Sequence, residues 1–225
     1  TAHPGYNRPT SITMRKPVLI GKALADADDA TQMAALKTII RNHPNLMTAL
    51  NTLRQADLPD PWLVSGAIYC NVWNHLTGGP ADYGVKDYDV FYFDADTSYQ
   101  AEDRIIKRLT PRFAANPPVE IRNQARVPPW YRDKFGRGYP AVATCKEAID
   151  RFACTTHCVG ARLIGPSQND DDLDIYAPFG LKEIFSFRLT PNLTLENRET
   201  HEAKAARQSA LWPELTVVPW PEEPA

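Results

Sequence analysis

The amino-acid sequence predicts an α+β fold in which a mixed, twisted sheet is flanked by helices. Two observations lead to this class. In the first half, short apolar segments with strand-like character alternate with amphipathic segments of helical spacing. In the second half, two neighbouring strand-like segments are followed by helical ones. With 225 residues, of which 43% are hydrophobic, the chain can bury one sizeable core. We therefore expect a single domain over residues 1–225.

The first half is expected to contain four helices and three strands after a loose N-terminal segment over residues 1–17. Apolar residues recur at helical spacing in the first two helical segments, as in Leu36, Ile39 and Ile40. The expected elements, in order, are helices over 28–41 and 45–55, a strand over 62–65, a helix over 67–76, a strand over 87–93, a helix over 99–109 and a strand that contains Glu120.

The second half is expected to be largely helical. Thr144 and Glu147 form a capping box, in which each side chain accepts a hydrogen bond from a free N–H at the helix start, and this predicts a short helix that ends at Phe152. The remaining expected elements are strands over 158–164 and 173–177, which form a hairpin, and helices over 179–188 and 194–210.

Two acidic residues, Asp87 and Asp89, open the strand over 87–93. Side chains alternate along a strand, so both carboxylates project from one face and Tyr88 projects from the other. Two carboxylates on an apolar strand repel each other and lose solvation, and a bound cation removes both penalties. Oxygen ligands favour a hard ion such as Mg²⁺. This pattern alone leaves open a second interpretation, in which both acids are solvated where the strand begins.

A turn of small residues, Ser65-Gly66, joins the strand over 62–65 to the following helix. The first N–H groups of a helix lack intrahelical partners, and the positive end of the helix dipole lies there, so such a turn is suited to bind phosphate. The turn alone is weak support for a phosphate site. A phosphate turn followed by an aspartate pair on the next strand is a much more specific pattern.

These segments resemble the nucleotidyltransferase superfamily of the DNA polymerase beta type, which includes the CCA-adding tRNA nucleotidyltransferases. The resemblance is strongest to a nucleotidyltransferase-like, largely bacterial family, and it spans roughly residues 45–215. The segments that carry it are 62–68 (WLVSGAI), 72–76 (VWNHL), 87–94 (DYDVFYFD), 98–103 (SYQAED), 123–127 (NQARV) and 176–181 (YAPFGL). The resemblance implies a polymerase beta-like catalytic core over residues 45–140 and a C-terminal half over residues 141–215.

The sequence departs from the pattern of this superfamily at two places. Tyr69 and Cys70 stand where such motifs often carry Arg and a polar residue. A long polar segment over 77–86 separates the phosphate turn from the aspartate pair, and we interpret it as a mobile loop over the nucleotide.

The resemblance implies a third carboxylate on a later strand, and Glu120 is the candidate. Val119 and Ile121 alternate with Glu120 and Arg122, so the two charged side chains share a face. Taken without the resemblance, this pattern favours a solvated strand face. The implied catalytic and metal-binding residues are Asp87, Asp89 and Glu120, and the implied nucleotide-binding residues are Ser65, Gly66, Arg122, Gln124 and Arg126. Arg126 is expected nearest the chemistry, in a loop over 122–139 rich in arginine and aromatic residues. The same composition fits equally well a partly packed loop with core aromatic residues and solvated charges.

The function that the resemblance implies is the transfer of a nucleoside monophosphate from a nucleoside triphosphate to an acceptor hydroxyl, with release of pyrophosphate. Two Mg²⁺ ions, with Mn²⁺ as the alternative, would be held by the carboxylates. The acceptor stays open between a small molecule, a tRNA end and a protein side chain. The alternative is a catalytically inactive nucleotide-binding or regulatory protein of the same fold, which the departures at Tyr69 and Cys70 favour.

The composition restricts partners and location. A formal net charge of −2 and an isoelectric point of about 6.2 argue against a broad nucleic-acid-binding surface. No apolar run approaches the length of a membrane span, and the polar residues 1–14 lack the apolar stretch of a signal peptide. We therefore expect no membrane partner and a cytoplasmic location.

Overall fold

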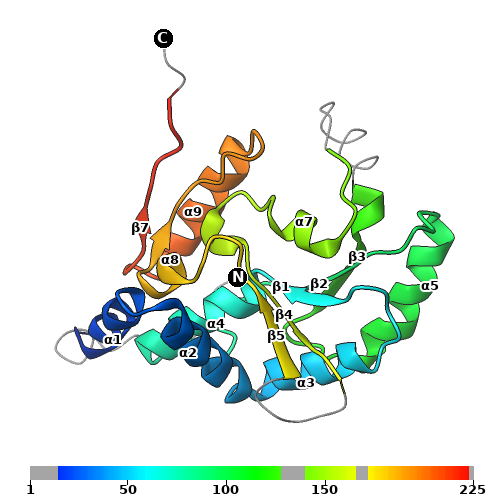
Figure 1. The fold of residues 1–225 in the computed structure, drawn as a ribbon, viewed down its shortest axis with the longest axis horizontal. Coiled ribbons are helices and arrows are strands. Elements are labelled where there is room, and N and C mark those ends of the chain that lie inside the picture. The colour runs from blue at the N-terminus through cyan, green and yellow to red at the C-terminus, as the bar shows by residue number, and fades with distance from the viewer. Residues whose placement is uncertain (1–14, 128–139, 166–171, 223–225) are drawn as a thin grey trace.

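The computed structural model describes residues 15–127, 140–165 and 172–222, and its centre is a five-stranded mixed sheet in the order β3-β2-β1-β4-β5 (Figure 1). The strands are β1 (Trp62–Val64), β2 (Tyr88–Tyr92), β3 (Val119–Asn123), β4 (Gly160–Leu163) and β5 (Leu173–Tyr176). β2 and β3 are parallel and are connected through a helix, whereas the other neighbours are antiparallel. The expected α+β class with a mixed sheet and flanking helices is confirmed.

The helices surround this sheet. They are α1 (Arg15–Ala25), α2 (Asp29–Arg41), α3 (Pro44–Arg54), α4 (Gly66–Thr77), α5 (Tyr99–Leu109), α7 (Cys145–Ile149), α8 (Lys182–Phe185) and α9 (Arg198–Leu211). Three 3₁₀ turns are η2 (Thr110–Arg112), η3 (Gln124–Arg126) and η4 (Thr155–His157), and a second, parallel pair of short strands is β6 (Arg188–Leu189) with β7 (Thr216–Val217). Among the described helices, none is long and apolar enough to cross a membrane.

The two faces of the sheet have different partners, because side chains alternate along each strand. The first face carries Leu63, Val90 and Ile121, which belong to the main buried cluster together with residues of α2, α3, α4 and α9. The second face carries Trp62 and Val64, which pack against Cys145 and Ile149 of α7 and against Cys158 in a smaller cluster. Asp89 of β2 also lies on this second face, because it alternates with Tyr88 and Val90.

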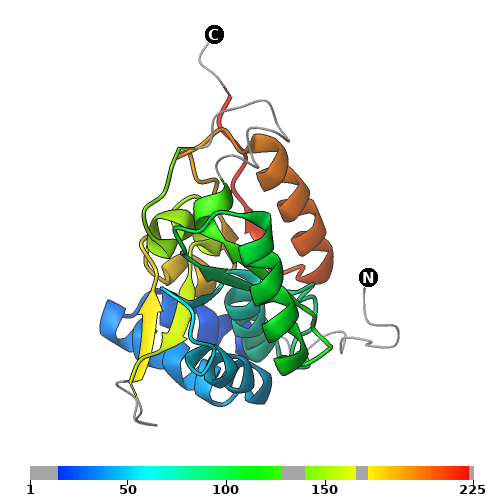
Figure 2. The ribbon, with the colours of Figure 1, turned by 90° about the vertical axis from the view of Figure 1, so that its right-hand side faces the viewer.

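The C-terminal half packs directly against α4. In Figure 2, α9 runs along the right-hand side of the molecule toward α4. The buried side chain of Gln208 in α9 donates a hydrogen bond to the Tyr69 hydroxyl at 2.6 Å. One turn further on, the indole N–H of Trp212 donates to the side-chain oxygen of Asn74 at 3.1 Å. α9 is therefore attached to α4 by buried hydrogen bonds as well as by apolar contacts.

Residues 15–17 were expected in a loose N-terminal segment, but they form the first turn of α1. Pro17 is compatible with this position, because an N–H in the first turn of a helix has no intrahelical partner to lose.

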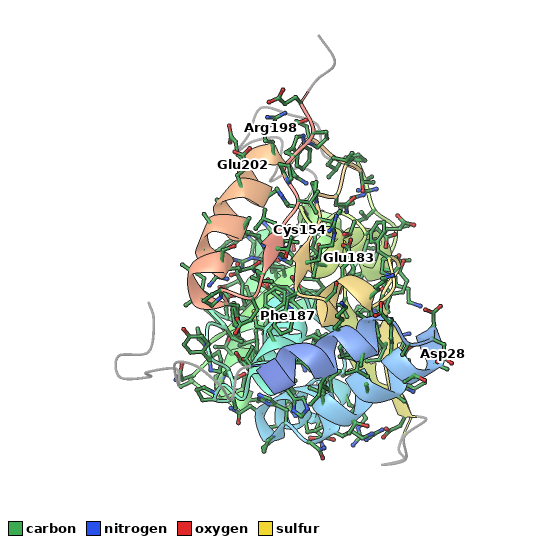
Figure 3. All side chains as sticks on the ribbon, turned by 90° about the vertical axis from the view of Figure 1, so that its left-hand side faces the viewer. Asp28, Cys154, Glu183, Phe187, Arg198 and Glu202 are labelled. Carbon is green, nitrogen blue, oxygen red and sulfur yellow. The ribbon has the colours of Figure 1, made fainter. Side chains whose placement is uncertain are left out.

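The expected helix over 179–188 is reduced to the four residues of α8. Gly180 before it and Phe187 after it have positive φ values of 73° and 53°, so the helical path cannot continue through either residue. Glu183, labelled in Figure 3, accepts hydrogen bonds from the hydroxyls of Thr155 (2.7 Å) and Thr190 (2.6 Å) and so connects α8 to η4 and to the end of β6.

The last helix begins at Arg198 instead of at the expected Thr194. The side-chain oxygen of Asn192 accepts a hydrogen bond from the backbone N–H of Thr194 at 3.2 Å, which stabilises a turn at this point. The strand expected over 158–164 is also shorter, since η4 ends at His157 and β4 begins at Gly160.

Candidate active site

Asp87, Asp89 and Glu120 lie on the second face of the sheet, at one end of β2 and β3. The parallel register places Asp89 opposite Glu120, and Asp87, just before β2, lies close enough for its charge to act on Asp89. On its other side, Asp89 is paired with Val64, the last residue of β1. The three predicted carboxylates therefore come from neighbouring strands, beside the point where the chain enters α4.

The electrostatic environment of Asp89 is unfavourable to its own charge. Burial, followed by repulsion from Asp87, raises the pKa of Asp89 from 3.8 to about 7, and Glu120 adds to this effect. Two cations, Lys204 and then Lys86, act in the opposite direction. Because its charged form is destabilised by burial and by the neighbouring carboxylates, Asp89 is a position where a bound cation would be strongly stabilising.

Each of the two outer carboxylates has a cationic neighbour in this structure. Lys86 lies 3.3 Å from Asp87, and Arg122 lies 2.6 Å from Glu120. Within the parts of the chain that the structure describes, no three His, Cys, Asp or Glu side chains are arranged to hold a metal ion. The carboxylates share one face of the sheet, but they do not share a coordination sphere.

The three carboxylates nevertheless fit a divalent ion in chemistry. They offer only oxygen atoms, which suit Mg²⁺. The ion pair of Glu120 with Arg122 is well exposed, with side chains 39% and 49% accessible. Exposed ion pairs contribute only about 0–1 kcal/mol, so Glu120 can turn toward Asp89 at small cost.

The Ser65-Gly66 turn forms the second part of the site. Ser65 is buried and has a φ of 57°, an uncommon conformation for a residue with a side chain, and it precedes the first residue of α4. Its N–H donates to the Val159 carbonyl at 2.8 Å, and its own carbonyl accepts from Ile68. No described residue accepts a hydrogen bond from the N–H of Gly66 or Ala67, so the start of α4 offers two donors next to the carboxylates.

Arg126 does not lie with the carboxylates, contrary to the expectation that it is nearest the chemistry. Its guanidinium forms an ion pair with Glu102 of α5 and lies 5.7 Å from the ring centre of Tyr99. Glu102 also accepts the N–H of Asn123, at the far end of β3 from Glu120. The partner that turns Arg126 away is distant in sequence, which explains why the local pattern misplaced it.

Gln124 also differs from its expected position. It was expected to share a face with Glu120 and Arg122, but β3 ends at Asn123 and Gln124 begins η3, so the alternation stops before it. Its side chain is buried and its amide lies 3.4 Å from the Arg122 carbonyl. Most of the arginine- and aromatic-rich loop, residues 128–139, lies outside the described residues.

Tyr69 and Cys70, the departures from the superfamily pattern, are core residues. Tyr69 is 2% exposed, receives the hydrogen bond from Gln208 and stacks on His157 with ring centres 4.5 Å apart. Burial raises the pKa of the Cys70 thiol to about 12, so this thiol stays uncharged. Both residues therefore serve the attachment of α9 and the core around α4.

The polar segment over 77–86 was interpreted as a mobile loop, but buried hydrogen bonds attach it to the helices. Asp82 is 8% exposed and accepts hydrogen bonds from Tyr88 (2.6 Å), Asn71 (2.9 Å) and Asn45 (2.7 Å). Its N–H also donates to Asn71 at 2.9 Å. This network fixes the chain just before β2 and so helps to position Asp87.

One basic residue near the carboxylates was given no role from the sequence. Lys204 lies on α9. Its charge lowers the pKa of Asp89 more than the charge of Lys86 does. The signal for its position is the buried row His201, Ala205 and Gln208 at helical spacing, which Lys204 directly borders.

Comparison with known proteins gives a matching family and a similar solved structure. A family model described as nucleotidyltransferase matches residues 51–217. A solved structure, described as an NMR structure that reveals a CCA-adding enzyme head domain, is similar with a TM-score of 0.65 and 26% sequence identity. The similarity covers 82% of this chain and 95% of that one. None of the curated proteins matches.

Proposed function

The chain belongs to the nucleotidyltransferase family, and from this premise we propose that it transfers a nucleoside monophosphate from a nucleoside triphosphate to an acceptor hydroxyl in a Mg²⁺-dependent reaction. The observation that carries the proposal is the position of Asp89. It lies between Asp87 and Glu120 and beside the start of α4, so a site for cations adjoins a site for phosphate.

The start of α4 is proposed to bind the triphosphate. The N–H groups of Gly66 and Ala67 are free for phosphate oxygens, and the positive end of the helix dipole stabilises their charge. Ser65 is held in place by its hydrogen bond to Val159, so these donors are oriented before the ligand arrives.

Asp87, Asp89 and Glu120 are proposed to hold Mg²⁺, with Mn²⁺ as the alternative ion. The bound ions would neutralise phosphate charge and lower the pKa of the acceptor hydroxyl. Glu120, the most exposed of the three, would either complete the coordination or take the proton of the acceptor. Arg122, which pairs with Glu120 in this structure, would bind phosphate oxygens when Glu120 turns toward the metal site.

The reaction is a displacement at the α-phosphorus. The acceptor oxygen forms the new bond to phosphorus, and the bond to the bridging oxygen of pyrophosphate breaks, so pyrophosphate leaves with the electron pair. The proton of the acceptor passes to Glu120 or to solvent. Positioning by α4 and the carboxylates therefore supplies most of what this chemistry requires of the protein.

The acceptor is proposed to be a small molecule, a tRNA end or a protein side chain. The net charge of −2 gives no support to binding along an extended nucleic acid. The similarity to a structure described as a CCA-adding enzyme head domain supports a tRNA end as one member of this set. We place the reaction in the cytoplasm.

The alternative function, nucleotide binding without catalysis, was supported by Tyr69 and Cys70. Both side chains are buried and are explained by packing against the C-terminal half. All three carboxylates are present on one face, so active transfer is the function that the geometry supports best.

Calorimetric titration with ATP, GTP, CTP and UTP, each with and without Mg²⁺, tests this proposal. We expect at least one triphosphate to bind the wild type in a Mg²⁺-dependent way, and we expect Asp89→Asn to lose this binding. Asp103→Asn, which changes an ion-paired carboxylate on α5, is the matched control and should bind normally. Absence of binding by all four triphosphates, or normal binding by Asp89→Asn, would contradict the proposal.

A further inference from the structure

Lys204 occupies an unusual position for a lysine. It is partly buried on α9, and its ammonium group lies 5.9 Å from the ring centre of Phe152. Among the described residues, none forms a salt bridge with it or accepts a hydrogen bond from its Nζ. The cost of removing this ammonium group from water is only partly offset, because a cation–π contact replaces only part of the lost solvation.

Phe152 places this ammonium group over the second face of the sheet. Its ring stacks on Phe91 with ring centres 5.6 Å apart. Phe91 follows Asp89 by two residues on β2, so its side chain projects from the face that carries the carboxylates. Lys204 therefore approaches the same face from the C-terminal half of the chain.

A second set of contacts places α9 over the phosphate turn. Gln208 lies one helical turn after Lys204 and donates to the Tyr69 hydroxyl at 2.6 Å. That hydroxyl lies against Gly66, since a Cβ built on Gly66 would be 3.7 Å from it. The same face of α9 thus adjoins the start of α4 through Gln208 and the aspartate strand through Lys204.

We propose that Lys204 binds the β- and γ-phosphate oxygens of the triphosphate held at the Ser65-Gly66 turn. This inference rests on the proposed function and adds to it a residue that distinguishes triphosphates from monophosphates. The phosphates supply the anion that Lys204 lacks, and a lysine ammonium serves as a point charge for such oxygens. The C-terminal half then contributes directly to substrate binding.

The test compares Lys204→Met with the wild type in calorimetric titrations with Mg²⁺. The ligands are the tightest-binding nucleoside triphosphate, its monophosphate, and inorganic tripolyphosphate as a probe without a base. We expect Lys204→Met to lose at least about tenfold in affinity for both triphosphate ligands, because a charge-assisted hydrogen bond is lost, and to bind the monophosphate as the wild type does. Lys204→Arg should restore most of the triphosphate affinity.

Lys182→Met, an exposed lysine on α8, is the control for loss of one positive charge and should bind every ligand normally. Thermal unfolding of each variant verifies folding, and Lys204→Gln replaces Lys204→Met if the latter does not fold.

The outcomes separate the two proposals. Normal triphosphate binding by Lys204→Met, combined with loss of binding in Asp89→Asn, overturns the role of Lys204 and leaves the proposed function standing. An equal loss of affinity for the monophosphate and the triphosphates also overturns it, since a merely structural role predicts that result. If the wild type binds no triphosphate, both proposals fail.

Discussion

At the scale of single residues, Asp89 combines two demands that oppose each other. Its position beside Asp87 and Glu120 suits a metal ligand, but the same neighbours and its burial make the charged form unfavourable when no metal is bound. Asp89 is therefore expected to lower the free energy of unfolding of the metal-free protein, a common cost at a site that must bind charge.

This conflict predicts a pH-dependent stability difference between the metal-free wild type and Asp89→Asn. The folded pKa of about 7 exceeds the ordinary 3.8, so the contribution of Asp89 to stability is complete below pH 3.8 and is lost as the pH rises through 7. With a chelator present, Asp89→Asn should be more stable than the wild type at about pH 8, and the difference should shrink at about pH 5. Thermal unfolding of both proteins at the two pH values measures it.

Added Mg²⁺ provides the control for this prediction. At the higher pH it should stabilise the wild type and leave Asp89→Asn unchanged, because only the wild type retains the full set of ligands. A stability difference of equal size at both pH values would show that charge repulsion at Asp89 is not its origin.

Single residues also show where sequence reasoning succeeds and where it ends. Asp87 and Asp89 were predicted on one face by strand alternation, which is a local property; Asp89 lies in β2 opposite Glu120, and Asp87 directly precedes the strand. Arg126 and Lys204 depend on distant partners. Glu102 turns Arg126 away from the carboxylates, while the packing of α9 on α4 brings Lys204 toward them. Neither arrangement can be predicted from the spacing of residues in the local sequence.

At the scale of elements, the second face of the sheet depends on the short helix α7. Thr144 caps this helix by accepting the N–H of Glu147 at 3.2 Å, as the sequence predicted. The Glu147 carboxylate accepts the N–H of Ala143 at 2.9 Å, whereas in a standard capping box it would accept the N–H of Thr144. α7 then buries Ile149 against Trp62 and covers the part of this face next to the carboxylates.

Gly160 on β4 is predicted to be essential for this packing. A Cβ at Gly160 would lie 2.8 Å from Cδ1 of Ile149 and 3.1 Å from the ring of Trp62, so the Ile149 side chain, or α7 with it, would have to shift. We expect Gly160→Ala to lower the free energy of unfolding by about 1–3 kcal/mol, the usual cost of overpacking. Urea denaturation measures this change.

Gly79→Ala is the matched control, because a Cβ there meets its neighbours only at ordinary contact distances of 3.5 Å or more. It should change the free energy of unfolding by less than about 0.5 kcal/mol. If Gly160→Ala is equally mild, the contact of α7 with the sheet is looser than the structure indicates.

Helices in the C-terminal half illustrate why element lengths are hard to predict. Leu181, Ile184 and Phe185 have helical spacing, and they do lie buried in and beside α8. The helix stops because Phe187 adopts a positive φ where the chain enters β6. For a non-glycine residue, the surrounding structure maintains this backbone conformation, so the local sequence does not predict it.

At the scale of the whole molecule, the two halves share one core. The main buried cluster extends from Ala25 to Trp212 and includes residues of α4, β2 and α9. His157 lies where these parts meet. It stacks on Tyr69, and its Nε2 lies 3.0 Å from the side-chain oxygen of Gln208. Because that oxygen can only accept, Nε2 carries the hydrogen, and the buried Nδ1 has no hydrogen-bond partner among the described residues.

The position of His157 predicts that the protein loses stability in mild acid. Burial, followed by the charge of Lys204, holds its pKa well below the ordinary 6.5. At pH values above 6.5 the side chain is neutral in both states and contributes no pH dependence. Below 6.5 only the unfolded chain takes up the proton, so this residue should lower the free energy of unfolding by up to about 1.4 kcal/mol per pH unit.

Denaturant unfolding of the wild type and of His157→Gln as a function of pH tests this prediction. His157→Gln is expected to be less stable at neutral pH, since a stacked ring is lost, but its stability should fall less steeply as the pH drops below 6.5. His75→Gln removes an exposed histidine from the end of α4 and should keep the wild-type slope. If His157→Gln and the wild type have the same slope, His157 is accessible to protons in the folded state, and α9 is less firmly attached to α4 than these contacts imply.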